Sequence, residues 1–242
     1  MNLFSEVVLQ TPKNKPRVHV IIPAFNEQNA VSKVITEIPS AWVSEIIVVD
    51  NGSTDDTYQQ AIDAGATALR QTTRGYGIAC LTGIEYLKNQ KYRPDIVVFL
   101  DGDYSDYPEE IPALVEPIQN GEVDFVIGSR TLGKREIGSM TPQQLFGNWL
   151  ATSLMKLFFR ATYTDLGPFR AISYDSLLML GMKDQDYGWT IEMQIKAHKL
   201  RLSYKEVPVN YRKRIGVSKV SGTVKGTIMA GYKIILTIFK YL

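Results

Sequence analysis

The chain has 242 residues, of which 45% are hydrophobic and 21% are charged, enough to build the core of one large α/β domain. Its formal net charge of +2 gives no bulk signal of a nucleic-acid-binding surface, so no nucleic-acid partner is expected. The one cysteine, Cys80, excludes an internal disulfide and a CxxC zinc site, and it indicates a reducing compartment.

The segment before residue 17 lacks the basic start and apolar core of a signal peptide, and no apolar run reaches the roughly 18 residues of a spanning helix, so a cytoplasmic protein is expected. Short β-branched runs then predict buried strands at residues 18–22, 45–50, 95–101 and 124–129. Apolar residues at helical spacing predict helices over 30–38 and 77–89. This alternation predicts a doubly wound, mostly parallel sheet flanked by helices. Beyond residue 130 the pattern is less regular, with one more strand expected within 204–211.

Polar clusters follow the predicted strands at the ends where a sheet of this kind binds ligands. They read PAFNE (23–27), DNGSTDDT (50–57), DGDYSD (101–106) and GSR (128–130). Because the carboxyl ends of parallel strands share one edge of the sheet, these clusters are expected to converge on a single site.

The acids at 101–106 need a positive partner, because neighbouring carboxylates repel one another. Asp101 and Asp103 lie two residues apart where the chain leaves a strand, so both can reach one point. Carboxylate oxygens suit Mg²⁺ or Mn²⁺, and substrate phosphates complete the shell of such ions. A metal that carries a nucleotide diphosphate would therefore explain the cluster, and a solvated turn is the structural alternative.

Two other clusters have structural alternatives as well. Asn51-Gly52 can simply turn the chain, with Ser53 or Thr54 capping a helix and two acids complementing its dipole. The segment RGYGIA (74–79) is either a phosphate loop or a flexible strand-to-helix link, because it matches neither GxGxxG nor the P-loop pattern.

The motifs VIIPAFNE, VVDNGSTDDT, FLDGDYSDYP and VIGSR, in this order, resemble those of the family 2 glycosyltransferases, which have the GT-A fold. The later segments TDLGPFRAIS, GWTIEMQIKA and EVPVNYRKRIGVSK are similar to those of the dolichyl- or polyprenyl-phosphate mannose and glucose synthases. The resemblance covers roughly residues 18–220. It implies a GT-A catalytic domain over residues 1–220 and a short apolar helical tail over 221–242.

The resemblance also implies roles for single residues. The nucleotide and donor would be bound by Pro23, Phe25, Asn26, Glu27, Asp50, Gly52, Ser53, Gly77, Asp101 and Gly102, with Asp50 holding the base. The metal ligands would be Asp101, Asp103 and Ser105, where Ser105 stands in a position that is often Gln in this branch. The acceptor phosphate would be held by Arg212, Arg214, Ser218 and Lys219.

The expected catalytic residues are Asp165, Arg130, Arg170 and Glu192. Arg130 would face the sugar donor or the acceptor phosphate. A polyprenyl phosphate is already anionic, so its transfer needs positioning and charge neutralisation rather than a strong base. A hydroxyl acceptor needs a carboxylate base, with Asp165 as the first candidate and Glu192 as the second. Alternatively, Asp165 pairs with Arg170 and only fixes the loop.

The predicted activity is inverting, metal-dependent transfer of a hexose from a GDP- or UDP-hexose to an acceptor, with a polyprenyl or dolichyl phosphate as the leading one. A family 2 enzyme acting on a hydroxyl of a glycan or small molecule is the alternative, and a non-catalytic nucleotide-sugar-binding protein is a third possibility. The apolar run 226–242 is either a packed helix or an interfacial helix that gives peripheral contact with the cytoplasmic face of a membrane.

Overall fold

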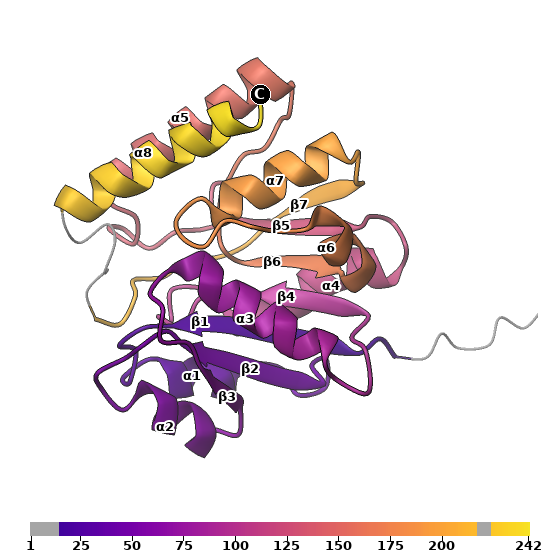
Figure 1. The fold of residues 1–242 in the computed structure, drawn as a ribbon, viewed down its shortest axis with the longest axis vertical. Coiled ribbons are helices and arrows are strands. Elements are labelled where there is room, and N and C mark those ends of the chain that lie inside the picture. The colour runs from indigo at the N-terminus through magenta and orange to yellow at the C-terminus, as the bar shows by residue number, and fades with distance from the viewer. Residues whose placement is uncertain (1–14, 217–223) are drawn as a thin grey trace, which may run out of the picture.

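The computed structural model describes residues 15–216 and 224–242 (Figure 1). In chain order its elements are β1 (Val18–Ala24), α1 (Val31–Glu37), β2 (Glu45–Asp50), α2 (Thr57–Asp63), β3 (Thr67–Arg70), α3 (Tyr76–Lys88), β4 (Ile96–Phe99), η1 (Pro108–Glu110), α4 (Ile111–Gln119), β5 (Phe125–Ser129), α5 (Pro142–Phe159), β6 (Arg170–Ser173), α6 (Tyr174–Leu180), α7 (Trp189–Lys199), β7 (Tyr204–Pro208) and α8 (Val224–Lys240).

The strands form one seven-stranded sheet in the order β3-β2-β1-β4-β6-β5-β7. Every neighbouring pair is parallel except the two pairs made by β6, which runs antiparallel between β4 and β5. The carboxyl ends of β1, β2, β4 and β5 therefore share one edge of the sheet. The mostly parallel α/β sheet predicted from the sequence is confirmed, and the reversed β6 is an addition to it.

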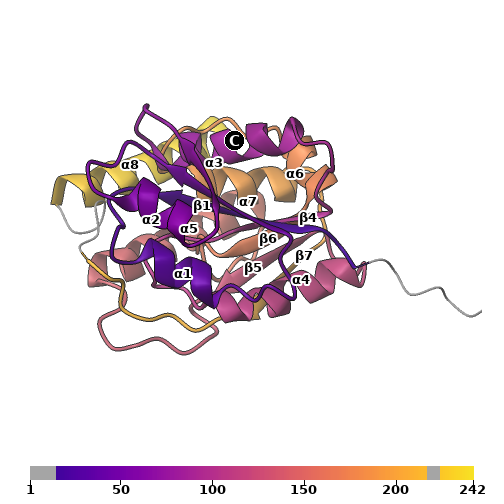
Figure 2. The ribbon, with the colours of Figure 1, turned by 90° about the horizontal axis from the view of Figure 1, so that it is seen from below.

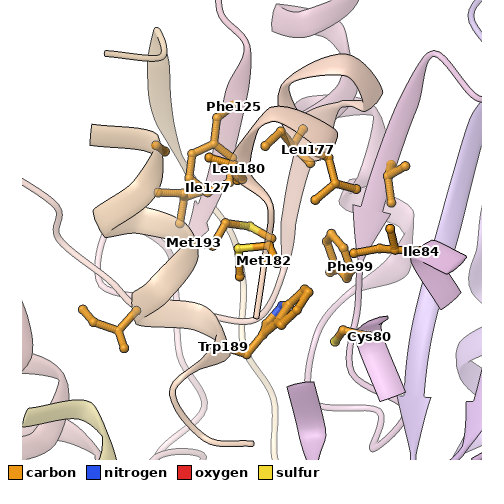
Figure 3. Packing of buried hydrophobic residues seen from close by; sticks show 14 of the residues in the cluster. Cys80, Ile84, Phe99, Phe125, Ile127, Leu177, Leu180, Met182, Trp189 and Met193 are labelled. Atoms are coloured by element: carbon orange, nitrogen blue, oxygen red, sulfur yellow. The ribbon is translucent and has the colours of Figure 1, made fainter. Parts of the chain in front are cut away.

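Helices cover both faces of the sheet, as Figure 2 shows. Successive strand residues point to opposite faces, so Ile21 packs toward α3 while Val20 and Ile22 pack toward α1 and α4. The core on the α3 side of the sheet also includes residues of α5, α6 and α7. There the rings of Phe99 and Trp189 pack edge to face, with their centroids 5.8 Å apart (Figure 3). The two apolar layers hold the sheet rigid beneath the loops at its carboxyl edge.

Seven elements were not predicted from the sequence: β3, η1, α4, α5, β6, α6 and α7. The strands β3 and β6 have only four residues each, too few to show a clear period. The helix α5 did have a local signal, since Thr141 and Gln144 form a capping box and Pro142 occupies the first turn. The second half of the chain is therefore more regular than expected.

The C-terminal helix α8 packs against α5 and α7, and it lies beside α5 at one end of the molecule (Figure 1). Thr237 and Ile238 are buried in this contact, whereas Tyr232 and Phe239 are exposed. Within residues 15–216 and 224–242, no helix has both the length and the apolar content to cross a membrane. One side of α8 is thus a packed helix face, and the other side is apolar and uncovered.

Candidate active site

The carboxyl ends of β1 and β4 open into a cavity of about 450 Å³. Among the residues that line it are these from the sequence prediction: Pro23, Phe25, Glu27, Asp101, Gly102, Asp103 and Arg214. They come from the end of β1 and from the loops after β1, β4 and β7, which are far apart in the sequence. The sheet topology therefore brings the donor, metal and phosphate candidates to one place.

The loop after β2 mainly supports the loop after β1. Ser53 Oγ accepts a hydrogen bond from the Asn26 amide at 2.9 Å, and Asn26 Oδ1 accepts one from the Thr54 amide at 2.8 Å. Asp50 in turn accepts a hydrogen bond from the Ser53 amide at 3.1 Å. Asn26, Asp50 and Ser53 thus lie next to the cavity as supports of its loops and not among its lining residues.

The start of α2 differs from the expectation that Ser53 or Thr54 would cap it. Both residues are engaged with the loop after β1. The N-cap residue is Asp56, whose side chain makes no capping bond, and the carboxylate of Asp55 accepts from the Thr57 amide at 3.1 Å instead. Tertiary contacts have shifted the cap by two to three residues.

The glycine-rich segment 74–77 forms another wall of the cavity. The Arg74 guanidinium stacks on the ring of Phe25 at 3.7 Å and donates to the Gly52 carbonyl at 3.0 Å. Gly77 lies buried in α3, where an added Cβ would overlap the Asp184 carbonyl. The glycine at 77 is therefore required by the close approach of the loop before α7, and its position gives it no direct contact with the cavity.

Five polar lining residues were not predicted: Asn51, Arg74, Tyr76, Asp186 and Tyr187. The first three lie inside motifs that had been singled out, so their neighbourhood was visible in the sequence. Asp186 and Tyr187 belong to an irregular loop without a recognisable spacing. Only the contact between this loop and segment 74–77 shows that they face the site.

Asp101 lies two residues after the end of β4 and accepts a hydrogen bond from the Tyr76 hydroxyl at 3.0 Å. Burial and the charge of nearby Asp103 raise the pKa of Asp101 to about 7. Two carboxylates this close favour any cation that can be shared between them.

In the structure the guanidinium of Arg214 pairs with one of these two carboxylates, that of Asp103, and with Glu27. Its Nη1 lies 3.1 Å from Asp103 Oδ2, and its Nη2 lies 2.6 Å from Glu27 Oε1. The other oxygen of Asp103 accepts from the Ser105 amide at 2.9 Å and from the Ser105 hydroxyl. Ser105 therefore orients Asp103, which is a different contribution from the expected third metal ligand.

The carboxylates fit a hard divalent ion in one respect. Among the described residues, no three acidic, His or Cys side chains are placed to hold an ion by themselves. Mg²⁺ and Mn²⁺ characteristically take one or two carboxylates and complete their shell with substrate phosphates and water. Asp101 and Asp103 in a polar cavity match that donor set, so a metal would be held jointly with a diphosphate.

The third acid of the cluster, Asp106, is handled differently. It is 1% exposed, and within the described residues neither of its carboxylate oxygens has a hydrogen-bond partner. Burial, with the charges of Asp101 and Asp103, raises its pKa well above the ordinary value. The raised pKa favours the neutral form of this carboxyl group, which weakens the repulsion within DGDYSD.

Arg212 lies outside the cavity. Its guanidinium stacks on Tyr104 at 3.4 Å and on Tyr107 at 4.4 Å, and it pairs with Glu37 at 2.6 Å. Arg212 therefore anchors the basic loop whose next arginine, Arg214, enters the site. The other two expected phosphate ligands, Ser218 and Lys219, lie outside the described residues.

Asp165 forms a buried bidentate ion pair with Arg130, with distances of 2.8 Å from Nε and 2.7 Å from Nη2. Burial opposes ionisation of this carboxyl, but Arg130 holds the pKa of Asp165 below its ordinary value. Both side chains are thereby committed to each other, and neither lines the cavity. The alternative in which Asp165 fixes a loop is favoured, although its partner is Arg130 and not Arg170.

Arg170 and Glu192 are fully buried. Arg170 donates to the carbonyls of Gly167 and Thr190, the latter at 3.1 Å, and burial lowers its pKa to about 10. Glu192 binds backbone amides of the loop before α7. The structure thus places both residues in the supporting framework, away from the cavity lining.

Residues 19–180, more than half of the chain, match the profile of Glycosyl transferase family 2. An uncharacterised protein of Methanocaldococcus jannaschii is 32% identical over 202 residues, which cover 81% of this chain and 82% of that protein. The undecaprenyl-phosphate mannosyltransferase of Micrococcus luteus is 29% identical over 223 residues, 87% of this chain and 90% of that enzyme.

Among solved structures, glucosyl-3-phosphoglycerate synthase of Mycobacterium tuberculosis, in complex with Mn²⁺, UDP and glucosyl-3-phosphoglycerate, superimposes with a TM-score of 0.74. The match covers 93% of this chain and 80% of that one at 24% identity, a level that establishes the shared fold. The topology, the acidic motif at the end of β4 and the family profile agree. The chain belongs to the family 2 glycosyltransferases and has their GT-A fold.

Proposed function

We propose that the enzyme transfers a hexose with inversion from a UDP- or GDP-hexose, with Mg²⁺ or Mn²⁺ as cofactor, to a polyprenyl phosphate. The observation that carries this proposal is the meeting of Asp101, Asp103 and Arg214 in one cavity. When bound there, the metal would neutralise the charge that develops on the departing diphosphate. The relatives whose names specify the acceptor include the Micrococcus luteus mannosyltransferase and a UDP-N-acetylglucosamine–dolichyl-phosphate N-acetylglucosaminyltransferase of Methanococcus voltae, which is 28% identical over 240 residues.

The chain's own residues would divide the work as follows. Asp101 and Asp103 would hold the metal, which would bind the diphosphate, while Tyr76 and Ser105 fix the two carboxylates. The stacked pair Phe25 and Arg74 offers a flat, cationic wall to the nucleotide. Arg214 would leave Asp103 for a phosphate oxygen when the substrates bind, because a divalent ion then takes over its charge. Catalysis of this type rests on positioning and electrostatics.

The state of the acidic residues supports a phosphate acceptor. Asp165 is paired with Arg130, and Glu192 is fully buried, so neither base candidate faces the cavity. Glu27 and Asp103 are paired with Arg214. An anionic phosphate needs no base, which fits this arrangement.

A hydroxyl acceptor remains the second candidate because of Asp186. Its carboxylate lines the cavity, where it could accept a proton from an acceptor hydroxyl, and burial together with the charge of Asp184 raises its pKa above the ordinary value. If the acceptor is a hydroxyl, Asp186→Asn should slow transfer by on the order of 10²–10⁴-fold. If it is a phosphate, the same change should leave the rate much less affected.

Peripheral contact with an anionic membrane is part of the proposal, at its cytoplasmic face. Exposed apolar residues form a stripe on α5 (Phe146, Trp149, Leu157) and another on α8 (Met229, Tyr232, Leu236, Phe239). The two helices carry lysines but no acid. Aromatic and aliphatic side chains flanked by cations suit the interface of an anionic bilayer. A second copy of the chain would instead bring two acid-free, cationic faces together.

The test is transfer by the full chain from UDP- and GDP-hexoses to a polyprenyl phosphate with Mn²⁺, read as the mass of the lipid product and the nucleotide released. Asp103→Asn should lose most turnover, while Asp63→Asn, a change of the same kind at an exposed site, should lose none. Turnover in the presence of excess chelator would refute the metal. Release of pyrophosphate would indicate nucleotidyl transfer, and binding without turnover would indicate a binding protein.

A further inference from the structure

The loop between α6 and α7, residues 181–188, forms one wall of the cavity that contains Asp101 and Asp103. Asp186 and Tyr187 line the cavity. The Gln185 carbonyl accepts a hydrogen bond from the Ile78 amide at 2.9 Å, which ties the loop to the start of α3. The shape of the cavity therefore depends on how firmly this loop is held.

Glu192, in the first turn of α7, is one anchor of the loop. Its carboxylate accepts from the Asp184 amide at 2.7 Å and from the Lys183 amide at 3.1 Å. Lys196 pairs with it at 2.8 Å. Because the Glu192 side chain is fully buried, water does not compete for these contacts.

Asp184 is the second anchor. Its Oδ1 accepts from the amide of Asp186 at 2.8 Å and from the amide of Gly188 at 3.1 Å. One carboxylate thus holds the backbone on both sides of Tyr187. Any shift of the Asp184 side chain would move the two lining residues.

Two side chains of the C-terminal segment, neither of which lines the cavity, reach these anchors. Lys233 pairs with Asp184 at 3.2 Å, and the Tyr241 hydroxyl donates to Glu192 at 2.6 Å. Between them, buried Thr237 packs on Gly188, where an added Cβ would come within 2.6 Å of its hydroxyl oxygen. Positions 233 and 237 lie four apart on one face of α8, and Tyr241 continues this spacing one residue after the helix ends.

The contacts of Lys233, Thr237 and Tyr241 with the loop form a ladder along the C-terminal segment. From this ladder we infer that Lys233 and Tyr241 are positioning residues for the sugar-nucleotide donor. They act through Asp184 and Glu192 on the loop that carries Asp186 and Tyr187. Neither Lys233 nor Tyr241 lines the cavity. Their contribution is to hold one wall of it in the binding-competent shape, which lowers the cost of ordering that wall when the donor binds. The inference rests on the proposed function, because it concerns the donor of that reaction.

The contacts are tested first without any substrate, by hydrogen exchange of the peptide that spans residues 181–189. Tyr241→Phe removes only the hydroxyl that reaches Glu192, and it should speed exchange of this peptide several-fold. Tyr232→Phe is the matched control, because the same hydroxyl is lost from a side chain that is 59% exposed. Equal exchange in the two variants would overturn the ladder.

Donor binding is then measured with UDP and GDP as probes in the presence of Mn²⁺, by calorimetry, together with KM and kcat for the sugar nucleotide. Whichever of the two nucleotides binds the unsubstituted chain, Tyr241→Phe and Lys233→Met should each lower the affinity for it by about threefold to tenfold. At saturating donor, kcat should stay within about twofold, since the metal motif is untouched. Lys233→Arg should restore most of the affinity, and Lys156→Met on α5 should match the unsubstituted chain.

Asp184→Asn combined with Lys233→Met should weaken binding no more than Asp184→Asn alone, because the lysine acts through that carboxylate. Faster loop exchange with unchanged nucleotide affinity would overturn the inference while leaving the proposed function intact. An unsubstituted chain that binds neither nucleotide would overturn the proposed function itself. The two failures are therefore distinguishable.

Discussion

Arg214 places its guanidinium against Asp103, 3.1 Å from Oδ2, at the position where a diphosphate-bound cation would be expected. The same guanidinium holds Glu27 at 2.6 Å, so one side chain joins the loops after β1, β4 and β7. On the proposed function, an arginine in this place would compete with a metal for Asp103 before substrate arrives and would turn to phosphate afterwards.

Removing this charge should therefore have two opposite effects. Arg214→Gln should strengthen binding of Mn²⁺ alone by roughly threefold, the scale of a partly exposed ion pair, as measured by the free-ion signal in electron paramagnetic resonance. The same variant should bind the complete sugar nucleotide more weakly and transfer more slowly. Lys213→Met, a change at the exposed neighbour, should alter neither quantity. Weaker Mn²⁺ binding in Arg214→Gln would show that the arginine supports the metal site instead of competing for it.

Asp165→Asn should lower the free energy of unfolding by roughly 3–5 kcal/mol, because it leaves the Arg130 guanidinium buried without its partner charge. Denaturant unfolding measures this, with Asp175→Asn as the control, since its pair with Arg93 is exposed and worth at most about 1 kcal/mol. Folded Asp165→Asn should still transfer to a polyprenyl phosphate, with a rate that is nearly flat across neutral pH. A large loss of kcat in Asp165→Asn, measured under conditions where the variant is fully folded, would restore Asp165 as a base.

Asp106→Asn should change how stability depends on pH. A carboxyl group whose pKa is raised on folding contributes stability that is present below its unfolded pKa and is lost as the pH rises toward the folded one. The amide does not titrate. The free energy of unfolding of the variant should therefore rise relative to that of the unsubstituted protein as the pH rises above about 4, the pKa of an aspartate in the unfolded chain. Unfolding curves at several pH values check this, with Asp63→Asn as the control. A constant difference at all pH values would show that folding does not raise the pKa of Asp106.

The membrane contact can be tested without disturbing the fold. Deleting residues 226–242 would also remove buried Thr237 and Ile238, so substitutions on the outer stripe are the sharper probe. Phe146→Ser with Trp149→Ser should reduce sedimentation with anionic vesicles at least about tenfold. Binding by the unsubstituted chain should also weaken at high salt.

Matched controls for this experiment are Tyr92→Ser and Met179→Ser, at apolar side chains that are 64% and 62% exposed elsewhere on the surface. These should bind vesicles like the unsubstituted chain. Light scattering gives the oligomeric state in parallel. A dimer that is broken by the α5 substitutions, in a chain that ignores vesicles, would assign the face to a second copy.

The sequence by itself determined the four strands β1, β2, β4 and β5, because a β-branched run buried on both faces is a local pattern that needs no knowledge of the rest of the chain. It also located the acidic motif at 101–106, since polar residues at the end of such a strand must lie at the sheet edge. The family could be recognised for the same reason: its motifs are short, contiguous and in fixed order.

Only the tertiary structure decided which charges meet. Asp165 pairs with Arg130 across 35 positions, and Arg214 reaches Glu27 across 187, because sheet order and loop packing set those distances. The same holds for Asp186 and Tyr187, which face the cavity only because Glu192 and Asp184 hold their loop against α3. Side-chain exposure on α5 and α8 was likewise settled by which faces the two helices use against each other and α7. Pairing and burial depend on long-range contacts, and those are not written in any local pattern.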